Sequence, residues 1–205
     1  MRLLVFTIAI LALIAAYRYW PWRDVRYGPG VVAAEEPVQL DSSEPHFGKV
    51  GDYKVTRLAE YTITARVLSS RRYRYGDGHD LVPIDLALGW GRMSDESVLD
   101  TLEISQAFRF YFYQWRGHPT IPPEEMATHS ANVHIIPAGP EVEHAVFGLP
   151  RGAVVRLTGD LVQARDTAGH TWTSSLTRND TGAGACELMY VRSAERIYPP
   201  TRIAQ

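Results

Sequence analysis

Residues 151–172, RGAVVRLTGDLVQARDTAGHTW, predict two strands joined by a tight turn. Apolar and β-branched residues dominate the run that ends at Arg165, and the DTAG that follows has the composition of a hairpin turn. Gly159 lies midway along the first strand, and a glycine there is typical of a barrel strand that bends. This hairpin therefore predicts a sheet that curls.

Further strands are predicted N-terminal and C-terminal to this hairpin. Residues 60–67, EYTITARV, alternate between polar and apolar side chains, which is the pattern of a half-buried strand. Residues 103–115 are rich in aromatic and β-branched residues and predict one long strand. Two shorter strands are expected at residues 131–138 and 185–193.

Helix signals occur between these strands. Asp95 and Glu96 follow Ser94, so we expect a helix that is capped by Ser94. Prolines and acidic residues near positions 122 and 140 begin two more short helices. Because strands outnumber helices and the connections are short, we predict an α+β fold that is mainly antiparallel. It would contain a small curled sheet or OB-like barrel and two or three short helices.

The composition is that of a globular protein. Of the 205 residues, 45% are hydrophobic and 21% are charged, which excludes wholesale disorder. The formal net charge is −2, so no global basic field attracts nucleic acid, and we expect no nucleic-acid partner. The histidines lack HxH, HxxxH and HExxH spacings, so we predict no metal site, and we expect no cofactor.

The N-terminus predicts a membrane anchor. An uninterrupted apolar run follows Met1 and Arg2, without a good A-x-A-like cleavage site. Counted through Trp20, the segment is just long enough to cross the ~30 Å hydrocarbon core of a bilayer. We therefore predict a signal anchor or transmembrane helix over residues 1–22, a tether over residues 23–51 and a globular α+β domain over residues 52–205.

Three blocks of the sequence resemble an uncharacterised family of bacterial proteins with an N-terminal membrane anchor. The blocks are VPIDLALGWGRMSD (residues 82–95), SANVHIIPA (130–138) and SSLTRNDTGAGACELMYV (174–191). The similarity extends from about Tyr61 to Arg192. It implies an anchor followed by a domain, and it brings no activity or catalytic residues.

The anchor and the resemblance together predict a single-pass protein of the bacterial inner membrane. Arg18, Arg23 and Arg26 outnumber Arg2, and this charge difference favours a cytoplasmic domain. The very short leader favours the opposite orientation, and we expect an extracytoplasmic domain. A lone cysteine cannot form an intramolecular disulfide, so it does not indicate the redox compartment.

Cys186, the only cysteine, follows a glycine-rich turn and begins a predicted strand. It shares a strand face with Leu188, which is typical of a buried structural thiol. The alternative is a nucleophile that is activated by His134, with Asp180 as a third member. That alternative predicts an enzyme acting on an envelope substrate.

Five other residues are candidates for ligand binding. Arg71, Arg72 and Tyr73 belong to a stretch in which arginines alternate with aromatic residues, a pattern that binds anionic polymers or stacks on flat groups. Asp85 lies in an apolar run, and Trp90 lies between two glycines that allow the backbone to present its ring. The structural alternatives are a solvated hairpin tip, a locally paired Asp85 and a Trp90 that fills the core.

The sequence therefore predicts a membrane-anchored binding or assembly module of the bacterial envelope, without catalytic activity. Its expected partners are other envelope proteins or an anionic envelope polymer or lipid, with the N-terminal helix in the membrane. Two alternatives stay open: the Cys–His enzyme, and a structural subunit of a larger membrane complex.

Overall fold

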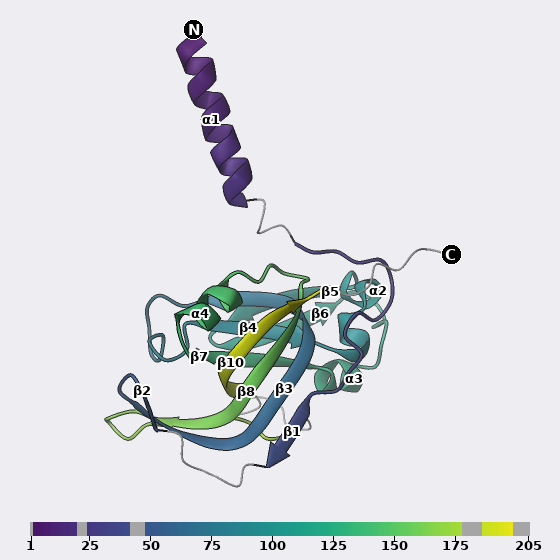
Figure 1. The fold of residues 1–205 in the computed structure, drawn as a ribbon. Helices are drawn as coiled ribbons and strands as arrows, with labels where there is room; N and C mark the ends of the chain where they lie inside the picture. Colours follow the sequence, from purple (N-terminus) through teal and green to yellow (C-terminus); the bar gives the residue numbers. More distant parts are fainter. Residues whose placement is uncertain (1, 20–23, 42–47, 178–185, 199–205) are drawn as a thin grey trace.

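The structure is a computed structural model that describes residues 2–19, 24–41, 48–177 and 186–198 (Figure 1). Its main element is a mixed sheet of eight strands. They are β1 (Val38–Asp41), β2 (Gly48–Val50), β3 (Tyr53–Arg72), β4 (Ile84–Gly89), β7 (Ser130–Pro137), β8 (Val154–Arg165), β9 (Thr171–Thr173) and β10 (Glu187–Ile197). A separate hairpin consists of β5 (Leu102–Ala107) and β6 (Phe110–Trp115).

The helices that the structure describes are α1 (Arg2–Tyr19), the 3₁₀-helix η2 (Gly91–Ser94), α2 (Glu96–Leu99), α3 (Pro123–Thr128) and α4 (Pro140–Phe147). The side chain of Asp95, and not that of Ser94, caps α2 by accepting a hydrogen bond from the Ser97 N–H. Figure 1 shows α1 apart from the sheet.

The strand order is β1-β3-β4-β7-β10-β8-β9, and β2 pairs with the beginning of β3. β7 and β10 are parallel, whereas the other strand pairs are antiparallel. β3 pairs with β8 over residues 54–66 and with β4 over residues 66–72. The path through β4, β7, β10 and β8 therefore returns to β3, and Figure 1 shows β3 and β8 curving together.

Gly159 of β8 lets β10 approach closely. A Cβ atom at this position would lie 2.0 Å from the carbonyl oxygen of Tyr190. The glycine that the sequence marks as a bend is thus required because no side-chain atom fits between these two backbones.

The main apolar core lies against one face of the sheet. It includes Leu86 of β4 and Val133 of β7, and α4 contributes Val146 to it. Asp85 and His134 are the strand neighbours of these core residues, so their side chains point to the opposite face. Alternation along β4 and β7 therefore places polar side chains under the β5–β6 hairpin, whose Gln106 contacts Asn132.

These observations correct the predicted fold class. In place of a small curled sheet or OB-like barrel behind a transmembrane helix, the described residues form a large mixed sheet of eight strands with short helices, in which β7 and β10 are the parallel pair. The sequence pattern identifies strands, but it does not contain the pairing that joins them into a sheet of this size.

The prediction of a membrane anchor is also corrected. In the part of the chain that the structure describes, no helix is long and apolar enough to span a membrane. This finding contradicts the predicted transmembrane signal anchor and the single-pass inner-membrane protein that depended on it.

Residues 24–36 form a strap that is bound to the domain, within the range predicted as a tether. The Ser94 hydroxyl accepts hydrogen bonds from the backbone N–H groups of Val32 and Ala33. Gly30 donates to the Asp95 carboxylate at 2.8 Å. The residues predicted to begin a helix therefore also hold the N-terminal strap.

Candidate functional site

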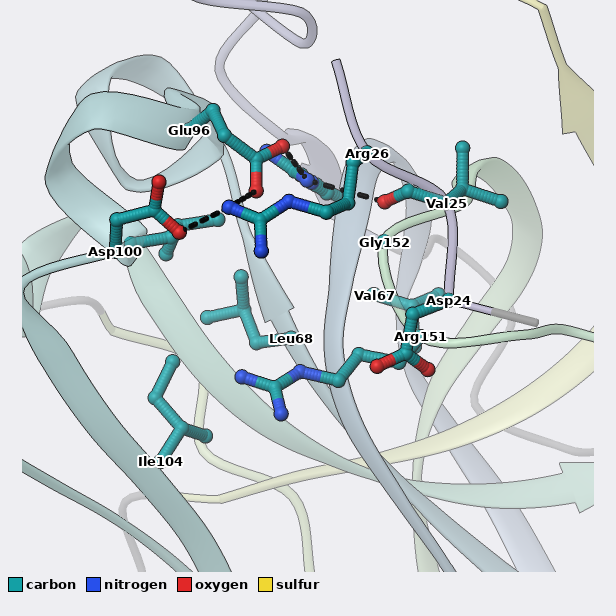
Figure 2. Close-up of a pocket in the computed structure, with 12 residues that line it drawn as sticks. Asp24, Val25, Arg26, Val67, Leu68, Glu96, Asp100, Ile104, Arg151 and Gly152 are labelled. Atoms are coloured by element: carbon teal, nitrogen blue, oxygen red, sulfur yellow. Dashed lines mark hydrogen bonds and ion pairs between the residues drawn. The ribbon is translucent and has the colours of Figure 1, made fainter. Parts of the chain in front are cut away.

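A hollow with a volume of 140 Å³ lies where the strap begins (Figure 2). The buried Arg66 pairs with Glu96 and donates to the carbonyl oxygens of Ser94 and Val25. Figure 2 shows Arg26 of the strap between Glu96 and Asp100, and both carboxylates bind it.

The strap binds to the domain at this hollow. Burial alone would raise the pKa of Glu96, but hydrogen bonds from Arg66 and Tyr27, with the nearby arginine charges, hold it below its usual range. Gly152 permits the contact, since an added Cβ would lie 1.8 Å from the Val25 carbonyl oxygen. The volume is also below the ~300 Å³ at which ligand pockets usually begin.

Another hollow is a cleft of 590 Å³. We call it the Trp172 cleft. Its wall includes Tyr53, Asp77, Arg109, Asp166, His170 and Trp172. Trp172 comes from the short strand β9, and Asp166 and His170 come from the turn between β8 and β9.

A buried polar network lies beside the cleft. Asp85 Oδ1 accepts hydrogen bonds from His134 Nδ1 at 2.8 Å and from Arg109 Nη1 at 3.2 Å. Asp85 Oδ2 accepts from the Tyr73 hydroxyl at 2.9 Å. The side chains of Asp85 and His134 are 1% and 4% exposed. Burial and then the Asp85 charge raise the pKa of Tyr73 to about 12.

Arg109 links this network to the cleft. Its guanidinium lies 3.6 Å from the ring centre of Tyr73 and 5.5 Å from that of Trp172. It also donates to the backbone carbonyl oxygens of Val82 and Asp77. These contacts fix a cation between two aromatic rings, an arrangement that is itself attractive.

The turn that carries Arg109 is strained. Phe108 and Arg109 connect β5 to β6 as a two-residue turn, with φ angles of 53° and 67°. Glycine and asparagine are the usual residues in such turns, because a left-handed backbone costs other residues roughly 1–2 kcal/mol each. The contacts of Arg109 offset this cost.

Cys186 lies near a second polar group. Asn132 Nδ2 is 3.9 Å from Cys186 Sγ, and Asn132 Oδ1 accepts from Gln106 Nε2 at 2.8 Å. Cys186 is partly buried. His134, its predicted partner, uses Nδ1 to bind Asp85. The predicted third member, Asp180, lies outside the described residues.

The structure places the five predicted ligand-binding residues in different environments. Tyr73 and Asp85 meet in the buried network. Arg71 donates to the Gln106 carbonyl oxygen, whereas Arg72 donates to Phe147 of α4, so the two arginines leave β3 on opposite faces.

Trp90 is fully buried, and its Nε1 donates to Glu36 of the strap at 2.7 Å. Its ring is therefore not presented on the surface, because it fills the core beside the strap. This corrects the interpretation of the two flanking glycines.

Sequence reasoning missed Arg109 and Trp172, the two residues that define the cleft. Arg109 falls in the middle of residues 103–115, which predict one strand because no glycine, asparagine or aspartate marks a turn there. Trp172 follows the DTAG turn that the sequence predicts, and this position is the sequence signal that could have identified it.

Comparisons with known proteins return no match among protein-family models, curated proteins or solved structures. The resemblance to a family of anchored bacterial proteins stays a prediction. Across the described residues, no group of three or more His, Cys, Asp or Glu side chains is placed to hold a metal ion.

Proposed function

We propose that the protein is a non-catalytic ligand-binding module whose ligand occupies the Trp172 cleft. The observation that carries the proposal is the position of Arg109, which a strained turn holds in the cleft wall above a buried carboxylate. Strained backbone and buried charge are concentrated at functional sites, where the fold maintains them against their cost. The cleft volume also falls within the range of small-molecule sites, about 300–1,000 Å³.

The network beside the cleft favours binding over catalysis. Both carboxylate oxygens of Asp85 accept hydrogen bonds, and the side chain of His134 is almost fully buried. A general base needs an oxygen or nitrogen within reach of substrate. The same contacts hold Arg109 and Trp172 in fixed positions, which lowers the entropy cost of binding.

Filling the cleft is expected to abolish binding without unfolding the protein. Ala168 lines the cleft and is exposed, so the substitution Ala168→Phe adds a ring there. The measurement is the ¹H–¹⁵N spectrum of the tryptophan indole groups, with Trp172 assigned by Trp172→Phe. The probes are a panel of sugars, carboxylates, amines and nucleosides.

At least one probe class is expected to shift the Trp172 signal in the native chain and not in Ala168→Phe. Thr167→Phe is the matched control, because Thr167 is exposed in the same turn and does not line the cleft. A Trp172 signal that no probe shifts would contradict the proposal.

The second candidate function is the Cys–His enzyme. The observation in its favour is that Asp85 orients His134 on the sheet face that also carries Asn132, which is close to Cys186. Because a binding module needs no thiolate, we expect folded Cys186 to react with iodoacetamide more slowly than the denatured chain does. Faster reaction in the folded chain, lost in His134→Ala, would make the enzyme the better interpretation.

A further inference from the structure

We infer that the ligand of the Trp172 cleft is a neutral saccharide, an inference that rests on the proposed function. It follows from the charges of the cleft wall, from the aromatic surface in it and from the hydrogen-bonding groups that surround that surface.

The cleft wall contains charged groups of both signs. Arg109 binds the buried carboxylate of Asp85 at 3.2 Å, and Asp166 Oδ2 accepts a hydrogen bond from His170 Nδ1 at 2.8 Å. An anionic ligand would meet the carboxylates of Asp77 and Asp166, whereas a cationic ligand would meet Arg109. Like charges brought together in a cleft are destabilising, so a neutral ligand fits best.

The aromatic surface favours a ligand with one apolar face. Trp172 is partly buried, and one part of its ring packs against His134, with the ring centres 4.7 Å apart. Tyr53 also lines the cleft, with Ala164 and Ala168. A pyranose ring has C–H groups on one face, and these groups pack against the electron-rich face of an aromatic ring.

Hydrogen-bonding groups of both kinds surround this apolar surface. The carboxylates of Asp77 and Asp166 are hydrogen-bond acceptors. The imidazole of His170 binds Asp166 through Nδ1, and its second ring nitrogen, Nε2, is not used in that contact. A hydroxyl group both donates and accepts, so the hydroxyls of a sugar suit a wall with mixed partners. The charged groups of the wall strengthen such hydrogen bonds without requiring a charged ligand.

The test uses the full chain and two matched pairs of disaccharides. Cellobiose is compared with its oxidised, anionic form cellobionic acid, and N,N′-diacetylchitobiose is compared with its deacetylated, cationic form chitobiose. The readout is the Trp172 indole signal. We expect both neutral sugars to shift this signal with affinities about tenfold or more above those of their charged forms.

We also expect Ala168→Phe to abolish the shift, and Thr167→Phe and Phe112→Ala to retain it. Phe112 is an exposed aromatic residue of the separate β5–β6 sheet, so its loss controls for aromatic content. Shifts from neutral sugars that persist in Ala168→Phe would place the sugars outside the cleft and overturn the inference.

The remaining outcomes separate the inference from the proposed function. Suppose that only a charged sugar or a non-sugar probe shifts the Trp172 signal and that Ala168→Phe blocks the shift. The inference of a neutral saccharide is then wrong, and the proposed binding module is retained. If no probe of either set shifts Trp172, both are overturned.

Discussion

Replacing Asp85 by alanine is expected to lower the free energy of unfolding by about 3–5 kcal/mol. The carboxylate is the shared acceptor of three groups, so its removal leaves Arg109, His134 and Tyr73 without their common partner. Removing one member of a buried charged network leaves the others desolvated and uncompensated, which is why the loss exceeds that of an exposed ion pair.

The measurement is urea-induced unfolding of the full chain. Asp77→Ala is the control, because the carboxylate of Asp77 is exposed and a change of about 0.5 kcal/mol or less is expected there. A loss below about 1 kcal/mol in Asp85→Ala would contradict the role given to the network.

The same network predicts a dependence on alkaline pH. The pKa of Tyr73 is raised in the folded protein from 10 to about 12, so folding favours the protonated phenol. This contribution to stability is fully present below pH 10 and is lost as the pH rises to about 12. In Asp85→Asn the charge that helps to raise this pKa is gone, so the alkaline loss of stability is expected to be smaller.

Replacing Gly159 by alanine is the second large effect that we expect, a loss of about 3 kcal/mol. The new methyl group would lie 2.0 Å from the Tyr190 carbonyl oxygen and 3.0 Å from the Cα of Val191. Both contacts are with backbone, so neither can be relieved by a change of rotamer. β8 and β10 would have to separate at the register position that joins Gly159 to Val191.

Thermal unfolding and urea unfolding both measure this loss. Gly28→Ala is the matched control, because Gly28 has no atom within 4 Å of an added Cβ. Equal stability of the two variants would show that the backbones of β8 and β10 adjust without cost. It would contradict the claim that position 159 requires glycine because no side-chain atom fits there.

Local periodicity predicts much of the strand content of this fold. The alternation in residues 60–67 lies within β3, and the hairpin predicted at residues 151–172 corresponds to β8 and β9. Periodicity reports which residues share a face, and it contains no information on which strands pair. The parallel pairing of β7 with β10 joins segments that are far apart in sequence, so the sequence pattern could not predict it.

The candidate site was predictable in part. A carboxylate in an apolar run requires a partner, and Asp85 has three. The sequence could also predict that Arg71 and Arg72 lie on different faces, because neighbouring residues of a strand point to opposite faces. The position of Arg109 could not be predicted, since Phe108 and Arg109 form a turn that only tertiary contacts stabilise.

The strap has a consequence for the order in which the chain folds. Its hydrogen bonds join residues that are far apart in sequence, such as Ala33 and Ser94, 61 positions apart, and Tyr27 and Glu96, 69 positions apart. Loop closure over such distances costs entropy before the contact stabilises anything, so long-range contacts form late. The strap also leaves the ribosome well before Ser94 and Glu96 are synthesised. The segment that is made early is therefore expected to reach its native contacts last.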